Sequence, residues 1–373
     1  MRRTVVRQLM AMLVAGLIAG YTLTTSAEGQ SAAGNLPARV EATAGAADVK
    51  AFIASRIKKG FTPTKTPWGD PDISGNFDTS PEANTPMERP NAWAERTMDS
   101  ITSKEMIDAI NKRQQAAVES APFAGGGEPE SGIAIAVPIH WFDNLAAVNS
   151  RPWYLVDPPD GKTPALTAAA QVRRDEAEKR QAEARKQPDF RPGGTRDDYT
   201  ERSSGERCIT MFGGIFRTPG IYGNAHRILQ TPTHVVFQSE MIHESRIIPL
   251  DGRAQPASDL RVHFGNSRGY WDGNSLVVET TNFHPDSPVY GAFGDNVRVV
   301  ERFTRIAPDK VEWTVTLDDE MTWTRAWTYS YPMTANDEKP IFEYACHEGN
   351  FGMSNLLSAG RLADKQGGFG VKK

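Results

Sequence analysis

The chain has 373 residues, a formal net charge of −4 and a pI near 6.0. Its 42 Lys and Arg are outnumbered by 46 Asp and Glu, so there is no basic stripe to neutralise phosphates and nucleic acid is excluded as a partner. The length excludes a minimal module and suffices for one large or two small domains.

Residues 1–27 are predicted to be a cleaved export signal. Arg2, Arg3 and Arg7 form a basic start, residues 9–23 are apolar, and small residues follow up to Ala27. An uncleaved anchor is the alternative, but about 20 apolar residues are needed to span a bilayer and this run is shorter. No other stretch is apolar enough to cross, so no stable membrane insertion is expected after cleavage. The predicted location is periplasmic or secreted.

The next part of the chain is predicted to be poor in β-structure. Residues 28–45 are rich in Ala, Gly and Ser and should form a disordered tether. Residues 46–206 should form a helical and extended wrapping region, in which Thr102 and Glu105 match a capping box. Residues 167–186 are strongly helical and highly charged, which is typical of a solvated excursion.

From residue 207 the hydrophobic period changes to two. The run 311–318, VEWTVTLD, places its apolar residues on one face, and six further stretches behave similarly, among them IFEYAC at 341–346. Asp-Gly pairs punctuate the chain as hairpin signals. The predicted fold class is mainly β: an antiparallel meander over 207–360 that closes into a barrel or folds into a sandwich, followed by a flexible tail at 361–373.

The motifs TPMERP, LVDPPDGKTPALT, EMIHESRIIPLDGR, NSRGYWDGNSLVVETTNF and YACHEGNFGMSNLL occur in this order. Together they resemble a large family of exported bacterial proteins for which no common activity is established. The meander also resembles a lipocalin, which implies an up-and-down barrel with a central cavity. Two positions depart from the family pattern: the acid after the MIH histidine is Glu244 rather than Asp, and Arg298 stands where a histidine is frequent.

The cysteines are Cys208 and Cys346. An even pair in an oxidising compartment predicts a disulfide. A free buried thiol, and a nucleophile or metal ligand, remain as alternatives for Cys346.

The stretch SEMIHESR carries a first group of candidate site residues. If the chain turns at residues 242–244, the side chains of Glu240, His243, Glu244 and Arg246 converge at a strand end. A histidine beside carboxylates suits general acid–base chemistry, and an arginine can hold an anionic group. The alternative is a surface charge cluster that satisfies itself.

Two further groups of candidates lie on later strands. Glu279 is an acid amid β-branched residues, so it is either paired with a base or is a proton donor with a raised pKa. The strand WTRAWTYSY aligns aromatic side chains and an arginine on one face, which suits a flat ligand or, alternatively, a packed core. These residues are Trp323, Arg325, Trp327, Tyr329 and Tyr331.

His347 and Glu348 follow Cys346, and the glycines after them could turn both inward. A metal site built from His243, His347 and Glu240 or Glu244 is the weaker hypothesis, because there is no helical His-x-x-x-His pair. No nucleophile elbow and no phosphate-binding glycine loop is present, so neither a metal nor a cofactor is expected.

These patterns predict an exported barrel that binds a small organic ligand. In the favoured hypothesis, His243 with Glu244 or Glu279 carries out cofactor-free proton transfer in a lyase, isomerase or hydrolase, while His347 and Arg325 orient the ligand. The alternatives are a non-catalytic carrier, a metal-dependent hydrolase and an envelope interaction protein.

Overall fold

The structure is a computed structural model that describes residues 36–119, 149–186, 198–210, 216–220, 222–287, 289–292, 297–338 and 340–365. The predicted export signal and the first part of the tether lie outside these residues. The remainder of the tether contains helix α2, Leu36–Glu41. No helix in the described part of the chain is both long and apolar enough to cross a membrane.

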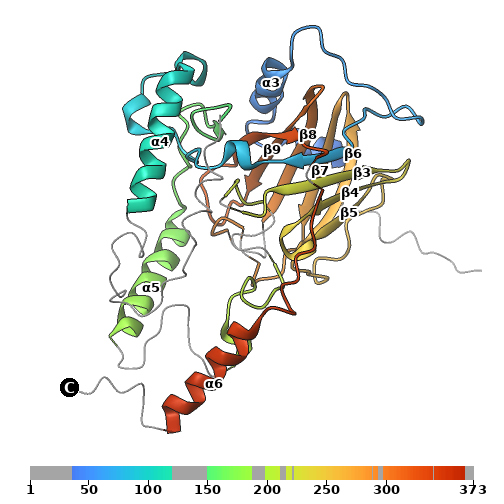
Figure 1. Ribbon diagram of the computed structural model, residues 1–373. Helices are drawn as coiled ribbons and strands as arrows, with labels where there is room; N and C mark the ends of the chain where they lie inside the picture. The colour runs from blue at the N-terminus through green and yellow to red at the C-terminus, as the bar shows by residue number, and fades with distance from the viewer. Residues whose placement is uncertain are drawn as a thin grey trace, which may run out of the picture. The chain divides into compact units, whose positions relative to one another are not determined.

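The strands form one antiparallel sheet in the described residues, as the period-two pattern predicts (Figure 1). They are β1 Gly75–Asp78, β2 Leu155–Asp157, β3 Ala225–Gln230, β4 His234–Ser239, β5 Ser245–Pro249, β6 Asn266–Asp272, β7 Ser275–Thr281, β8 Arg298–Ala307, β9 Lys310–Asp318 and β10 Trp327–Ala335. Their order is β5-β4-β3-β1-β10-β9-β8-β7-β6, with β2 paired to β10. Two meanders, β3–β5 and β6–β10, are therefore joined through β1.

The joining strand β1 comes from the region predicted only to wrap the sheet. Phe77 pairs with His226 of β3 on one side and with Ala335 of β10 on the other. The strand was not predicted because it has only four residues and lies in a Pro- and Gly-rich sequence. The N-terminal region is thus part of the sheet.

The two ends of the sheet, β5 and β6, approach each other through side chains. A Cβ on Gly269 of β6 would lie 2.8 Å from Leu250 Cδ2 and 2.9 Å from Ile248 Cγ2. No hydrogen-bonded pairing joins β5 to β6 among the described strands. The sheet is therefore a curved meander whose outer strands pack together at a position that requires glycine.

Turn chemistry follows the sequence at one of the three Asp-Gly pairs. Asp272 pairs with Ser275, and Gly273 takes a φ of 59° in the two-residue loop between β6 and β7. Tight hairpins need such a positive φ, which glycine adopts without steric penalty. The other two pairs, at Gly161 and Gly252, lie in longer connections.

Both faces of the central strand β9 are buried. Trp313, Val315 and Leu317 join the hydrophobic core, as their alternation predicts. On the opposite face Glu312 is also buried, because Arg151 from the N-terminal region contacts it through two nitrogens at 2.8 and 2.9 Å. Arg151 of the wrapping region thus lies against the second face of β9.

The helices largely follow their sequence signals. Helix α3 spans Ala46–Arg56, and α4 spans Ser103–Glu119 after a capping box in which Thr102 N–H donates to Glu105 at 2.9 Å and Glu105 N–H donates to Thr102 Oγ1 at 3.3 Å. Helix α5 spans Ala168–Arg185.

The C-terminal end differs from the prediction. Residues 341–346 are not a strand, since the Phe342 N–H donates to the Glu240 carboxylate at 3.3 Å instead of joining a ladder. The following segment, predicted as turn and tail, is helix α6, Phe351–Lys365. Met353, Leu356 and Leu357 are half-buried at helical spacing, a signal that the neighbouring glycines obscure.

Candidate functional site

The aromatic row of β10 lies in the core. Trp327, Tyr329 and Tyr331 are at most 2% exposed, and the strand begins only at Trp327. The Tyr331 hydroxyl donates to the carbonyl of Arg217 at 3.0 Å, and the Tyr329 hydroxyl donates to the carbonyl of Phe216. These three rings pack as a core face, which is the alternative that the sequence left open.

Arg325 does not join this row. The chain between Trp323 and Trp327 is not a strand, and the Arg325 guanidinium contacts the buried carboxylate of Asp157 at 2.7 and 2.9 Å. Its charge is balanced inside the protein.

The chain turns sharply within the SEMIHESR stretch, between β4 and β5. Ile242 has a φ of 61° and His243 a φ of 45°. Residues other than glycine rarely adopt positive φ values, and β-branched residues such as Ile242 do so least often. The turn separates its side chains instead of gathering them. His243 is exposed and its Nδ1–H donates to the Tyr344 carbonyl at 3.1 Å, whereas Glu244 is buried at 5% exposure. Such local strain marks a functional candidate.

Arg246 and Glu301 form a buried ion pair near Glu244. The two guanidinium nitrogens lie 2.6 and 2.8 Å from the Glu301 oxygens, and Trp313 Nε1–H donates to the same carboxylate at 3.0 Å. The Arg246 guanidinium also sits over the rings of Phe216 and Phe237. Its two terminal nitrogens therefore donate hydrogen bonds to Glu301 and not to Glu244.

Glu244 is consequently a buried acid for which the described part of the chain provides no ion-pair partner. Burial raises the pKa of its carboxyl to about 8, the nearby Arg246 opposes the shift, and the charge of Glu301 adds to it. Its Oε2 atom has no hydrogen-bond partner among the described residues. At neutral pH the carboxyl group is thus mostly protonated and can act as a hydrogen-bond or proton donor.

The raised pKa predicts how stability depends on pH. Below the unfolded-state value near 4.5 both states bind the proton, whereas between 4.5 and about 8 only the folded state keeps it. The free energy of unfolding should therefore fall across this window, relative to E244Q, by up to about 1.4 kcal/mol per pH unit. Urea unfolding of both proteins from pH 5 to 8 measures the difference, with the exposed E348Q as control. A pH-independent difference would contradict the assignment.

His226 of β3 is a buried histidine that no sequence motif singled out. Its Nδ1 lies 3.1 Å from Ser239 Oγ, and its ring stacks on Phe237 and meets the edge of Trp313. Burial, and then the charges of Arg217 and Arg246, lower its pKa to about 3. It stays neutral at physiological pH. The sequence did contain a signal for its burial. His226 lies two residues after Asn224 and two before Ile228, so the period of two along β3 places all three side chains on the buried side.

Glu279 belongs to a different electrostatic group. It is fully buried and forms ion pairs with Arg39 at 2.7 Å and Arg298 at 3.6 Å, while neither of its oxygens has an aligned hydrogen bond in the described residues. Burial raises its pKa against the effect of these arginines.

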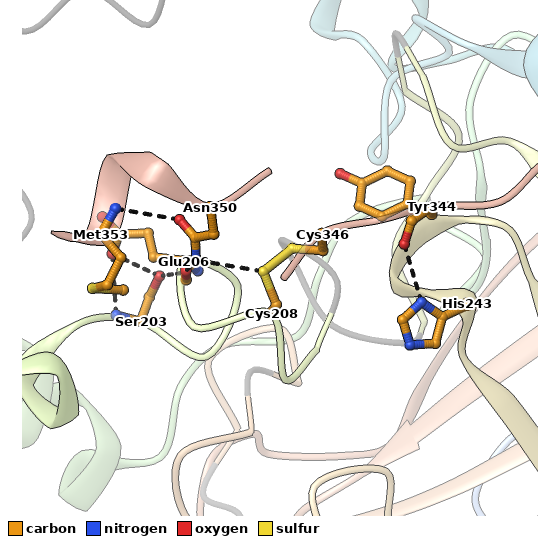
Figure 2. Close-up of a disulfide and its surroundings, with 8 residues drawn as sticks. All are labelled: Ser203, Glu206, Cys208, His243, Tyr344, Cys346, Asn350 and Met353. Carbon is orange, nitrogen blue, oxygen red and sulfur yellow. Dashed lines mark hydrogen bonds between the residues drawn. A yellow bond between two sulfur atoms is a disulfide. The ribbon is translucent and has the colours of Figure 1, made fainter. Parts of the chain in front are cut away.

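The predicted disulfide is present between Cys208 and Cys346, which are 138 residues apart in the sequence (Figure 2). Figure 2 also shows His243 on the carbonyl of Tyr344, two residues before Cys346. A hollow of about 430 Å³ lies beside the disulfide, lined by Glu206, Asn350 and residues 343–346 among others. His347 and Glu348 are exposed and do not line it.

A larger groove lies where the N-terminal part of α5 meets the loops at the end of the sheet. Its volume is about 860 Å³. The walls comprise residues 163–166, one face of α5, Tyr290 with Gly291, and Thr322 with Trp323. Trp323 is thus a predicted ligand-binding residue that lines an open space, whereas Trp327 and Tyr329 do not.

A metal centre was the weaker hypothesis. No cluster of three or more His, Cys, Asp or Glu that could hold a metal ion occurs in the described ranges. His243 contacts the Tyr344 carbonyl, and Glu240 accepts the Phe342 N–H.

Comparisons with known proteins give little further guidance. No family model matches the chain, and no curated protein matches it. A solved structure, a secretary abundant heat soluble (SAHS) protein from Ramazzottius varieornatus, is similar to 31% of this chain over 74% of its own length. The identity is 15% and the TM-score is 0.21. At this level the likeness carries no argument about function, which must rest on the geometry above.

Proposed function

We propose that the protein is an exported binding protein that holds a small organic ligand in the groove between α5 and the loops that contain Tyr290 and Trp323. The scaffold of this proposal is a lipocalin-like barrel formed by the curved meander, with β5 packed against β6. The disulfide and the basic, then apolar, N-terminal sequence support a periplasmic or secreted location.

The groove itself carries the proposal. A volume of about 860 Å³ falls within the range of roughly 300–1,000 Å³ that is typical of ligand pockets. Its wall combines apolar side chains, among them Leu166 and Trp323, with a few charged ones on α5. This mixture matches ligand sites, in which apolar surface supplies affinity and polar groups fix orientation.

Helix α5 leaves this space open because of its side chains. Ala170 and Ala177 face the groove and are too small to fill it, whereas the large aliphatic residue Val172 is 56% exposed on another face. A helix that packed permanently against the sheet would present large apolar residues there. A ligand would supply the missing contact.

The N-terminal end of α5 is firmly attached. Thr167 caps the helix, since Ala170 N–H donates to its Oγ1 at 3.1 Å, and Thr167 N–H donates to the Thr322 carbonyl at 3.0 Å. Leu166 forms a β-bridge with Trp323. One wall of the groove is therefore held by backbone hydrogen bonds, which supports a preformed site.

Filling the groove should weaken ligand binding. The probe is N-phenyl-1-naphthylamine, a neutral aromatic compound that fluoresces in apolar sites. A177W places an indole in the groove and should weaken its affinity about tenfold or more, roughly 1.4 kcal/mol. The control A182W adds the same side chain to an exposed position on α5 that does not line the groove. Equal affinities for the two variants in a fluorescence titration would refute groove binding.

A cofactor-free acid–base enzyme is the second candidate, and Glu244 favours it. A buried carboxyl group with a pKa near 8 and a partnerless oxygen in the described structure is suited to proton donation. The exposure of His243 and the arginine pairs of Glu279 make Glu244 the principal residue of this hypothesis. Glu244 does not line the groove, so this candidate is tested independently of the probe. Compounds that wild type converts and E244Q does not, as mass spectrometry would detect, identify an enzyme; conversion that E244Q retains contradicts this role of Glu244.

A further inference from the structure

We propose that the ligand of the groove is an organic anion with a flat, aromatic body. This inference rests on the proposed binding function and adds the chemical class of the ligand. Its basis is the juxtaposition of an aromatic wall with arginines that project from one face of α5.

The aromatic wall is held in a fixed orientation. Trp323 is 4% exposed and meets Trp327 edge-on, with ring centroids 5.5 Å apart. Tyr290 packs on the same Trp327 at 5.8 Å, and its hydroxyl donates to the Phe216 carbonyl at 3.0 Å. Two aromatic rings whose positions are set by the core give the groove a rigid surface. Flat apolar groups pack favourably against such a surface.

The opposite wall is positively charged. Arg173, Arg174 and Arg180 line the groove, and Glu176 is the one acid among its described lining residues. These positions recur at helical spacing with Ala170 and Ala177, so the small residues and the arginines share one face of α5. Among the groove-lining side chains the positive charges therefore exceed the negative ones.

The internal ion pairs of two of these arginines are loose. Arg174 lies 3.7 Å from Glu178 and 3.9 Å from Asp175, and Arg180 lies 3.9 Å from Glu176. These separations exceed hydrogen-bonding distance, in contrast to the 2.6 and 2.8 Å contacts of Arg246 with Glu301. Among the described residues no acid lies within hydrogen-bonding distance of these two guanidinium groups. Such donors can turn to a carboxylate or sulfonate, which they bind in a planar, bidentate manner.

A pair of probes isolates the charge. 8-Anilino-1-naphthalenesulfonate has the body of N-phenyl-1-naphthylamine plus one sulfonate. Wild type should bind the sulfonate about fivefold more tightly than the neutral probe, a moderate factor because Arg174 and Arg180 are exposed to solvent. R174Q/R180Q should remove most of this preference by lowering the affinity for the sulfonate more than the affinity for the neutral probe. The control K179Q removes a positive charge from α5 outside the groove and should preserve the preference.

The outcomes separate this inference from the proposed function. If both probes bind in the groove with equal affinity, as A177W would report, the ligand class is wrong and groove binding stands. If K179Q lowers the preference as much as R174Q/R180Q does, the attraction is a general effect of the helix charge and the inference fails. If neither probe is sensitive to A177W, both proposals fail.

Discussion

Replacement of Glu301 with leucine is expected to destabilise the fold by about 3–5 kcal/mol. The substitution leaves the Arg246 guanidinium buried at 3% exposure without its bidentate partner, and it removes the acceptor of Trp313 Nε1–H. The cation–π contacts with Phe216 and Phe237 remain, but they cannot replace a carboxylate. Equilibrium urea unfolding measures the change.

Two controls show whether the unpaired charge is the cause. The double variant R246M/E301L removes both charges and should recover most of the loss, to within about 2 kcal/mol of wild type, because only the indole N–H remains unsatisfied. D251N breaks the solvent-exposed pair with Arg253 and should change stability by less than about 1 kcal/mol. A double variant as unstable as E301L would show that packing volume, not charge, dominates.

Loss of the disulfide is the second large expected effect. Cys208 and Cys346 close a loop with a sequence separation of 138. The chain-entropy model then gives about 5 kcal/mol of stabilisation through the unfolded state. C208S/C346S should therefore unfold at a markedly lower urea concentration than oxidised wild type.

The two cysteines are the only ones in the chain, so wild type in reducing buffer is a direct control. It should match C208S/C346S, since the bridge is absent in both. Addition of reductant to the double variant should have no effect. If reductant leaves the wild-type transition unchanged, the bridge does not stabilise the protein in the assumed manner.

The sequence predicted the strands best where alternation was regular and turns were short. The run 311–318 and the hairpin at Gly273 were identified because each strand has an apolar inner face and the turn needs a positive φ. The prediction of a strand at 341–346 was wrong. Alternation of apolar residues is not sufficient for a strand, because the backbone must also find a neighbouring strand to pair with. The Phe342 N–H meets a distant glutamate, which no local pattern reveals.

Site prediction was limited for a related reason. His243 and Glu244 are adjacent in the sequence, yet the positive φ values at Ile242 and His243 send one outward and the other inward. The arginines that pair with Glu279 and Glu312 come from residues 39 and 151, far away in the chain. The environment of a buried acid is set by the arginine that pairs with it, and the spacing of residues along the sequence does not reveal which arginine that is. The groove depends similarly on α5, whose charged sequence indicated only a solvated helix.

Diffraction from crystals soaked with a bromonaphthalene sulfonate tests the central claim most directly. An anomalous bromine peak between Ala177 of α5 and the ring of Trp323, with the sulfonate facing Arg174 or Arg180, is the result that groove binding predicts. A fully bound ligand located elsewhere, or a groove filled by the chain's own side chains, would contradict it.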